Sequence, residues 1–170
     1  MEETPKQYTQ RILSYIGSDD PFRAQRATPA KLERLLRGLS RNRLFRRPAP
    51  GKWSIAEILA HLAEAEWVVG YRIRMILNSN GTPIQAFDQD DWARTSRYDR
   101  QDPRKSLALF RALRESNLAL VRSVPPRKLR NYGMHAERGK ETVAHIVRLM
   151  AGHDRNHLRQ IERLRAPREK

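Results

Sequence analysis

Two histidines, His153 and His157, stand four residues apart in a long apolar-periodic segment near the C-terminal end of the sequence. Apolar residues recur every three or four positions from Val143 to Leu164, and both histidines take places where this pattern calls for aliphatic side chains. With a rise of about 1.5 Å per residue, their rings would lie about 6 Å apart along a helix. Two imidazoles so placed can converge on one cation, as in the HExxH helix. The spacing therefore predicts a metal-binding pair.

His61 is the best candidate for a third ligand, because it flanks the apolar face of a second expected helix. The residues along this edge are Ser54, Ile58, His61, Ala65 and Val68. Catalytic zinc normally takes three protein ligands and leaves one position for water. The HxxxH pair by itself leaves open a plainer alternative, since buried histidines are often hydrogen-bonded core groups. A third inward histidine on a different helix favours the metal site.

The composition indicates a folded protein and excludes cysteine chemistry. The chain has 170 residues, of which 39% are hydrophobic, and this suits one domain with a sizeable core. It contains no cysteine, so disulfides, thiolate ligands and a cysteine nucleophile are excluded. The N-terminal residues lack the layout of a signal peptide, and no apolar run approaches the ~20 residues of a membrane span. We therefore expect a cytoplasmic protein.

The chain is strongly basic: 34 Lys and Arg against 19 Asp and Glu give a net charge of +15. Such a surplus attracts nucleic acid, anionic lipid and acidic small molecules. The densest basic cluster lies between Arg41 and Lys52, whereas other arginines, among them Arg111, Arg114 and Arg122, are expected on the outer faces of helices. Neither a basic strand interleaved with aromatics nor a helix-turn-helix is evident. We interpret the charge as a solvated surface; the alternative is a nucleic-acid-binding helical module with structural histidines.

Capping and breaking residues predict the first helices. A short amphipathic helix is expected from Pro5 to Ile16, closed by Gly17. Thr28 is expected as the N-cap of the next helix, with Pro29 at its first position and Leu39 near its end.

Three longer helices are expected further along the chain. Ser54 and Glu57 form a capping box for a helix that stops at Asn78–Gly81. Asp102-Pro103 opens the next, and Pro125-Pro126 ends it. The histidine-bearing helix follows.

An aromatic and acidic stretch from Thr82 to Asp102 joins two of these helices. It is too long for a simple bundle turn, and such loops are often functional or carry a short helix. No run shows convincing β alternation, and no linker divides the chain. The sequence therefore predicts an all-α protein: a four-helix bundle with a short extra N-terminal helix and a long connection between bundle helices 2 and 3. We expect a single domain over residues 1–170, with a core of about residues 28–165.

Three motifs follow one another along the chain: KWSIAEILAHL from Lys52 to Leu62, FDQDDWA from Phe87 to Ala93, and GHDRNHLRQI from Gly152 to Ile161. Together they resemble the DinB-like (damage-inducible) superfamily, especially its bacillithiol-transferase-like branch. The resemblance covers roughly residues 30–164. It implies a four-helix bundle that binds a divalent metal through one histidine of the second helix and an HxxxH pair of the fourth. Those ligands fall on His61, His153 and His157.

The resemblance implies several activities. Similar proteins include thiol S-transferases that use low-molecular-weight thiols, a thiol-dependent isomerase and candidate hydrolases, and homodimers are typical. Zinc fits three imidazole ligands, and nickel or iron is also compatible. An open coordination position could take a thiol as thiolate, or a water that attacks an ester or amide. We therefore predict a metal-dependent enzyme acting on a small substrate, either a transferase or a hydrolase. A family member whose metal is purely structural is a further alternative.

Four polar residues are candidates to support the ligands, because a ligating imidazole usually donates its other N–H to a carboxylate or carbonyl. They are Glu57, Glu64, Asp154 and Gln160. Glu64 follows His61 by three residues and could serve as a ligand or general base; the alternative is a solvated carboxylate on the helix surface.

The remaining candidates lie in the connections. Asp91 and Trp92 are expected to shape substrate entry, although core packing is an equal alternative for Trp92. His135 is expected to be a solvated loop residue, and His145 falls off the apolar stripe, at the surface or between helices.

Overall fold

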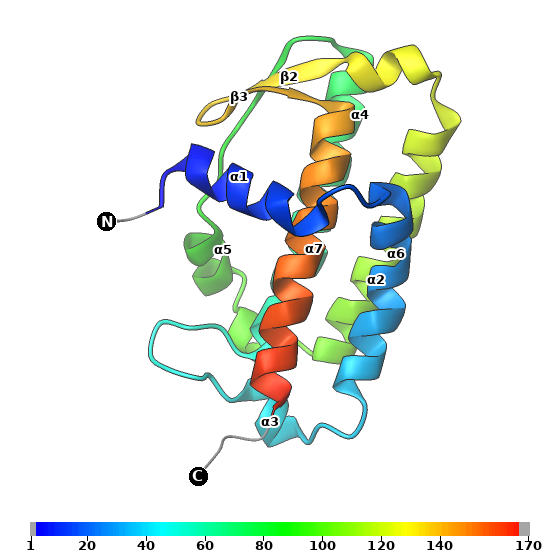
Figure 1. The fold of residues 1–170 in the computed structure, drawn as a ribbon. Helices are drawn as coiled ribbons and strands as arrows, with labels where there is room; N and C mark the ends of the chain where they lie inside the picture. Colours follow the sequence, from blue (N-terminus) through cyan, green and yellow to red (C-terminus); the bar gives the residue numbers. More distant parts are fainter. Residues whose placement is uncertain (1–2, 167–170) are drawn as a thin grey trace.

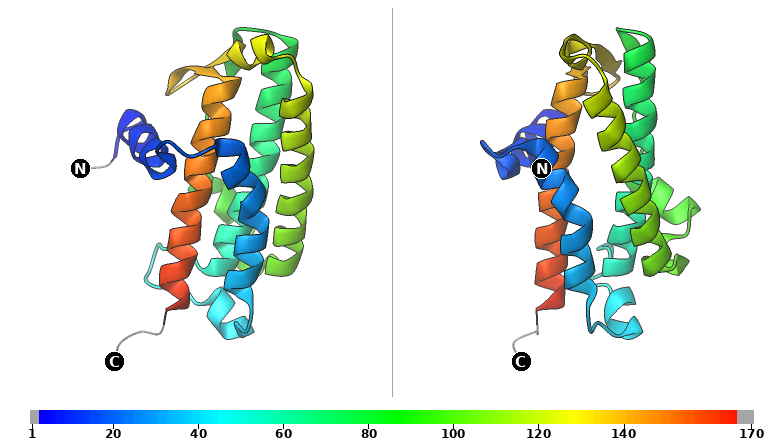
Figure 2. Two further views of the ribbon diagram at one scale, coloured as in Figure 1. Left: turned by 45° about the vertical axis from the view of Figure 1, so that its right-hand side comes forward. Right: turned by 90° about the vertical axis from the view of Figure 1, so that its right-hand side faces the viewer.

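Four long helices form the body of the molecule in the computed structural model, which describes residues 3–166. They are α2 (Pro21–Leu36), α4 (Ile55–Asn78), α6 (Pro103–Ser123) and α7 (Val143–Arg165). Figures 1 and 2 show them running lengthwise beside one another, with α4 packed on α6 and α2 packed on both α6 and α7. The predicted all-α four-helix bundle is confirmed.

Local capping chemistry explains where these helices begin. Ser54 Oγ accepts a hydrogen bond from Glu57 N, and Glu57 Oε2 accepts one from Ser54 N at 2.8 Å, which completes the predicted capping box of α4. Asp102 caps α6, which has Pro103 at its first position, and Thr142 caps α7.

The predicted N-cap at Thr28 is wrong. Helix α2 begins directly after Asp20, whose side chain caps it, and continues through Pro29. A proline inside a helix has no N–H, so the carbonyl four residues earlier loses its partner. Gln25 O, left free in this way, accepts a hydrogen bond from Arg114 Nη1 at 3.2 Å. A contact from another helix therefore compensates for the proline, which the local sequence does not reveal.

The N-terminal helix α1 (Pro5–Ile16) has the predicted bounds and lies across α7 (Figure 1). The two helices touch at Gly152, where an added Cβ would lie 2.1 Å from Ile12 O. Ile12 and Ile16 are fully buried by this packing. The close approach of the two backbones therefore requires glycine beside His153.

A small three-stranded sheet covers one end of the bundle, contrary to the expectation that the chain has no strands. β1 (Thr82–Ile84) pairs in parallel with β2 (Tyr132–His135), and β2 pairs antiparallel with β3 (Gly139–Thr142). In Figure 1 the β2–β3 hairpin lies beside the first turn of α7. Strands of three or four residues are too short to show a period of two in the sequence.

The connection from Thr82 to Asp102 carries short helices. After β1 it forms α5 (Gln89–Thr95), capped by Asp88, and the 3-10 helix η1 (Tyr98–Arg100). The described residues form two further short elements: α3 (Arg41–Phe45), which precedes α4, and the 3-10 helix η2 (Pro126–Arg130), which precedes β2.

Two apolar clusters fill the bundle, one toward each end. One contains Ile58, Phe110 and Ile161, and the other contains Ile76 and Val147. The turns of α7 that carry the two histidines lie between these clusters. Within residues 3–166, no helix combines the length and apolar character that crossing a bilayer would need.

Replacing Gly152 with alanine should destabilise the protein. Helix propensity alone would make alanine about 1 kcal/mol more favourable, but its Cβ would clash with the backbone of α1. We expect a net loss of about 1–3 kcal/mol in the free energy of unfolding, measured by urea denaturation. Ala144→Gly, at an exposed position of the same helix, calibrates the propensity effect. A more stable Gly152→Ala protein would contradict the packing of α1 on α7.

Candidate metal centre

Three histidines from two helices converge in the core. His61 on α4 is 3% exposed, and His153 and His157 on α7 are each 7% exposed. His153 Nε2 lies 3.1 Å from His61 Nε2 and 3.1 Å from His157 Nε2. One ligand atom from each residue lies within 4.8 Å of the others. The structure thus brings together the three residues that the sequence singled out.

Burial keeps these imidazoles neutral. It lowers the pKa of His61 and His153 well below the usual value for histidine, and repulsion from the positive charge that His157 would carry when protonated lowers both further. Burial also lowers the pKa of His157 to about 4, against the opposing effect of its hydrogen bond to Gln160. Near pH 7 all three rings are therefore unprotonated bases with a free lone pair, which is the form that binds a metal.

Gln160 selects the tautomer of His157. Its Oε1 lies 3.0 Å from His157 Nδ1 and, as a carbonyl oxygen, can only accept a hydrogen bond. The proton of His157 is consequently on Nδ1, and the Nε2 lone pair points at the other two histidines. This contact is what a supporting residue of a metal ligand would make.

The distances from His153 Nε2 to the other two ring nitrogens fit a single divalent cation, and all three ligand atoms lie within 4.8 Å of one another. Zn–N bonds of about 2.0–2.1 Å place tetrahedral ligand atoms roughly 3.3 Å apart, close to the observed 3.1 Å. His153 Nδ1 is buried without a hydrogen-bond partner among the described residues. Without a cation, the lone pairs of neighbouring ring nitrogens would repel one another wherever no N–H lies between them. The donor set therefore suits a metal better than a purely hydrogen-bonded core.

A cavity of about 600 Å³ opens onto two of the ligands, His61 and His153. Its walls come from α1, α4, the start of α5, the β2–β3 hairpin and the first turns of α7. Besides the histidines, the polar residues around it are Glu3, Tyr8, Arg72, Asp88, Gln89, Asp90, Glu137, Arg138 and Glu141. A small molecule can therefore approach the triad, as a catalytic centre requires.

One wall of the centre is aromatic. The Trp53 ring lies 4.8 Å from the His61 ring, and the Tyr98 ring lies 6.2 Å from that of Trp53. The Tyr98 hydroxyl donates a hydrogen bond to Glu64 Oε2 at 2.7 Å. Burial raises the pKa of Tyr98, and the Glu64 carboxylate raises it further, so Tyr98 stays protonated. Glu64 is thus held by Tyr98 and is not among the residues that line the cavity; its catalytic role stays a prediction.

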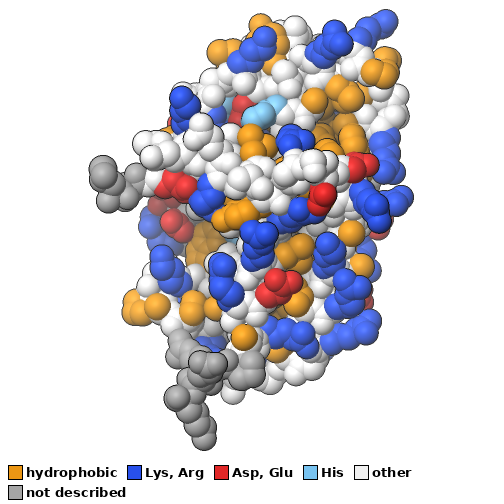
Figure 3. Space-filling model, viewed as in Figure 1, with side chains coloured by type: hydrophobic (Ala, Val, Ile, Leu, Met, Phe, Trp, Pro, Cys, Tyr) orange, Lys and Arg blue, Asp and Glu red, His pale blue; other side chains and the backbone are white. Residues whose placement is uncertain are grey.

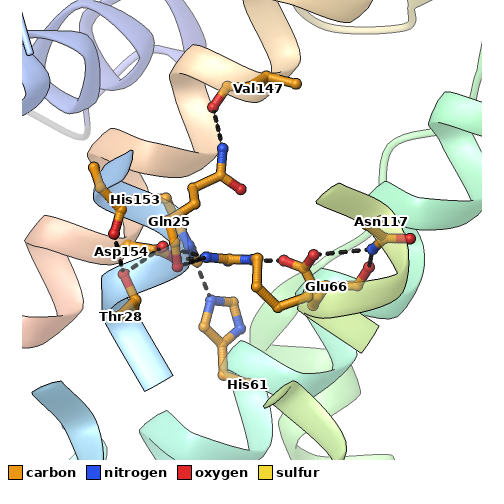
Figure 4. Close-up of polar contacts among 10 residues, drawn as sticks. Gln25, Thr28, His61, Glu66, Asn117, Val147, His153 and Asp154 are labelled. Carbon is orange, nitrogen blue, oxygen red and sulfur yellow. Dashed lines mark hydrogen bonds and ion pairs between the residues drawn. The ribbon is translucent and has the colours of Figure 1, made fainter. Parts of the chain in front are cut away.

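A buried ion cluster lies directly behind the histidines (Figure 4). Arg114 on α6 donates to both Oδ atoms of Asp154, at 2.9 Å for Oδ1, and to Glu66 Oε2 at 2.8 Å. Thr28 Oγ1 donates to Asp154 Oδ2 at 2.9 Å, and Asn117 Nδ2 donates to Glu66 Oε1 at 2.9 Å. The cluster therefore joins α2, α4, α6 and α7 at one level.

The charges of this cluster are strongly interdependent. Burial raises the pKa of Asp154, although the Arg114 guanidinium opposes the shift. Burial by itself would lower the pKa of Arg114, but Asp154 and Glu66 more than offset this and raise it. One guanidinium thus stabilises two buried carboxylates, each of which would be costly without it.

Arg114 corrects the sequence prediction that placed it on an outer helix face, because it is 1% exposed. A signal for this existed: Phe110, Arg114, Asn117 and Val121 follow one another at three- and four-residue spacing and are all buried on α6. Glu66, also buried, was likewise missed as part of this network. Polar residues in an apolar stripe indicate a buried network.

The other predicted supporting residues lie as follows. Glu57 accepts hydrogen bonds from Arg47 and Ser54 rather than from an imidazole. Asp154 is adjacent to His153 in sequence but contacts Arg114 and Thr28. Their effect on the ligands is therefore through the position of their helices.

Two predicted entry residues lie on α5. Trp92 packs against Phe87, with 4.6 Å between the ring centres, and is half-buried. Asp91 is exposed and forms an ion pair with Arg94. Their roles in substrate entry stay predictions.

His135 corrects a second expectation, since it is 3% exposed rather than solvated. Its Nδ1 accepts a hydrogen bond from Glu137 N at 3.2 Å in the β2–β3 turn. Folding of the hairpin against the bundle buries it, and the short strands gave no warning of this. His145 is half-buried on α7, in line with the sequence prediction.

Comparison with known proteins agrees with this geometry. The family model described as the DinB superfamily matches residues 24–161. The chain belongs to the DinB superfamily. The match begins inside α2, so α1, which forms part of the cavity wall, lies outside the matched residues of this DinB protein.

Curated relatives of this DinB protein carry names that place them provisionally among metal-dependent hydrolases. One from Oceanobacillus iheyensis is 26% identical over 115 residues, covering 67% of this chain and 66% of the relative, just under two thirds. YfiT of Bacillus subtilis is 25% identical over 138 residues, covering 80% of this chain and 77% of YfiT.

A solved structure of YfiT is similar in fold, with a TM-score of 0.78 over 96% of this chain and 88% of YfiT, at 21% identity. It is described as a probable metal-dependent hydrolase with an unusual four-helix bundle topology. The likeness supports the bundle topology of the DinB protein independently of its sequence motifs.

Arg114→Met should strongly destabilise the protein, because it leaves Asp154 and Glu66 buried without a counter-charge. We expect a loss of about 3–5 kcal/mol in the free energy of unfolding, measured by urea denaturation. Arg111→Met is a matched control on the same helix: its ion pair with Glu33 is exposed and should contribute at most about 1 kcal/mol. Equal losses in the two variants would show that the buried cluster contributes little.

The metal-free protein should lose stability as the pH falls below about 6.5, the ordinary pKa of histidine. The pKa values of the three histidines are depressed in the folded state, to about 4 for His157. Between these values the unfolded chain binds more protons, so stability is full above pH 6.5 and declines below it. The slope should reach about 1.4 kcal/mol per pH unit for each histidine, measured by urea unfolding. His157→Gln removes one of these titrating groups, so it should reduce the slope by about 1.4 kcal/mol per pH unit. A wild-type stability that does not change with pH in this range would contradict the lowered histidine pKa values.

Proposed function

We propose that this DinB protein is a metal-dependent hydrolase of small substrates, with a divalent cation held by His61, His153 and His157. The observation that carries the proposal is the convergence of three buried, neutral imidazoles at the base of an accessible cavity. The names of the relatives support the same reaction class. Zinc fits the ligand set best, and nickel or iron is compatible with it.

The bound cation would supply Lewis acidity, lowering the pKa of water and polarising a carbonyl. In hydrolysis, water attacks the carbonyl carbon and the C–O or C–N bond breaks. The hydroxyl joins the acyl group, and the proton goes to the leaving group. The chain's own contribution is orientation: Gln160 fixes the tautomer of His157, and Arg114 anchors the helix that carries His153.

One cavity carboxylate is unsuited to accept the proton from water. Glu141 binds Arg138 Nε at 2.7 Å and Nη2 at 3.0 Å, and the pKa of Glu141 is lowered by Arg138 despite its burial. It therefore serves to position Arg138 in the cavity wall. Asp90 and Glu137 also line the cavity and make no side-chain ion pair among the described residues, which makes them the better candidates.

Thiol transfer is the competing reaction for the same centre. The chain has no cysteine, so a nucleophilic sulfur would have to come from a low-molecular-weight thiol cosubstrate. Metal coordination would favour its thiolate form. The positive net charge would suit an anionic thiol, but the cavity wall holds more carboxylates than arginines. Hydrolysis is therefore the reaction that we favour.

Untagged protein reconstituted with Zn²⁺ should bind about one ion per chain, measured by elemental analysis after dialysis, since three imidazoles suffice for a catalytic site. His61→Ala, His153→Ala and His157→Ala should each reduce the affinity at least about tenfold. His145→Ala, on α7 outside the triad, is the control and should bind as wild type does.

Activity then separates the two reactions. The loaded protein should release nitrophenol from nitrophenyl esters, with activity lost in the His61→Ala variant. Turnover only when a small thiol and an electrophile are both supplied would favour transfer. A metal-binding protein inactive in both assays would favour a structural metal, and wild type that binds no metal would overturn the proposal.

A basic groove favours a second candidate function, nucleic-acid binding. This groove, of about 510 Å³ between α2 and α7, is lined by Lys31, Arg34, Arg155, Arg159 and Arg165, with Glu162 as its acidic residue. Figure 3 shows Lys and Arg side chains over much of this face. Binding to single- and double-stranded oligonucleotides, titrated against salt, tests it: a steep salt dependence with micromolar affinity near physiological salt would support it. Homodimerisation and a cytoplasmic location also stay proposals.

A further inference from the structure

A second cavity lies beside the metal cavity and is mostly apolar. Its volume is about 830 Å³. Trp67, Tyr71 and Met75 line it from the outer face of α4, and Met134 lines it from β2. Of the five large apolar side chains that are exposed among the described residues, these are four. Exposed apolar side chains gathered in one place usually mark a binding surface; we call this one the apolar groove.

The opposite wall of the apolar groove runs from β1 through the following segment into α5. Pro83, Ala86, Phe87 and Trp92 line it there, and the rings of Phe87 and Trp92 pack together. Among the described residues that line the groove, Arg72 is the one charged residue. In a chain with 31% charged residues, so uniform an apolar lining is unusual.

The apolar groove is continuous with the metal cavity. Val68, Arg72 and Phe87 line both. Val68 follows His61 by seven residues on α4, which corresponds to about 10 Å along the helix axis, and Met75 lies about 10 Å further. A molecule of ordinary metabolite size can therefore reach from the histidines into the groove.

Arg72 stands at the junction of the two cavities. It donates a hydrogen bond to Gln85 O, its one hydrogen-bond partner among the described residues, and its guanidinium lies 5.5 Å from the centre of the Phe87 ring. Its other N–H groups are donors without an acceptor in residues 3–166. They can bind a carbonyl or other polar group located between an apolar portion in the groove and a reacting bond at the metal.

We propose that the apolar groove is a substrate subsite, and that the substrate is an ester or amide with a medium-length alkyl or aryl portion. The bond to be cleaved would lie at the histidine centre, and the apolar portion would lie along Trp67, Tyr71 and Met134. This proposal rests on the proposed hydrolase function. The continuity of the two cavities favours a small-molecule occupant over a second copy of the chain.

Alkyl hydroxamates test the subsite directly, because their head group chelates zinc while their chain length varies. Octanohydroxamate should bind zinc-loaded wild type at least about tenfold tighter than acetohydroxamate in calorimetric titrations, since each methylene removed from water favours binding. Tyr71→Ser and Met134→Ser should remove most of this preference while leaving acetohydroxamate affinity and metal content unchanged. Leu109→Ser is the matched control: Leu109 is 52% exposed, on α6, and does not line the groove.

Several results would overturn the subsite. Equal affinity for the two hydroxamates would do so, as would a length preference that both groove variants retain. Failure of octanohydroxamate to bind zinc-loaded protein would also overturn it. Sedimentation could instead show that wild type is a dimer and that Tyr71→Ser makes it monomeric. If the protein also showed no preference for the longer hydroxamate, the groove would be assigned to a second copy of the chain.

Failure of the metal proposal is distinguishable from failure of the subsite. Metal content is measured in every sample, so wild type without zinc would refute the hydrolase function alone. In that case the fluorescent apolar probe anilinonaphthalene sulfonate is titrated onto the metal-free His61→Ala protein, with octanoate as competitor. An apolar subsite would be supported if octanoate displaces the bound probe and if Tyr71→Ser abolishes probe binding while Leu109→Ser does not. Absence of binding would overturn it.

Discussion

The position of Arg114 constrains the rest of the structure. Its guanidinium binds Asp154 on α7, Glu66 on α4 and the Gln25 carbonyl on α2, so one side chain fixes three partner helices relative to its own. Asp154 follows His153 directly, and Glu66 lies about one and a half turns beyond His61. Because unpaired buried charges are costly, the helices cannot slide past one another without breaking this cluster. The same constraint holds the histidines of α4 and α7 in register.

Two departures from ordinary helix chemistry occur around this cluster. Pro29 interrupts the hydrogen-bond pattern of α2, and the carbonyl that it frees is used by Arg114. Gly152, a poor helix former, allows α1 to contact the backbone of α7 next to His153. Each residue is unfavourable locally and is compensated by a contact from a distant part of the chain. Such conflicts between local preference and tertiary structure are expected at functional sites.

The centre combines a base on two long helices with a wall of shorter segments. The ligands lie on the two long helices that the ion cluster connects, whereas the cavity wall comes from α1, the segment around α5 and the β2–β3 hairpin. The family match over residues 24–161 includes the ligands, α5 and the hairpin, whereas α1 precedes it. Such an arrangement, with site residues on a rigid scaffold and shorter segments around them, is common in functional sites.

Features that depend on local spacing and local capping could be predicted from the amino-acid sequence. The HxxxH pair, the third histidine at His61 and the capping box at Ser54 were all evident, because a helix places residues three and four apart on one face. Other features depend on contacts between distant segments. The burial of Arg114 and His135, the pairing of β1 with β2 and the path of α2 through Pro29 depend on partners distant in sequence. Periodicity along α6 can place Arg114 on the buried face, but it does not reveal which charges and backbone groups of other helices Arg114 binds.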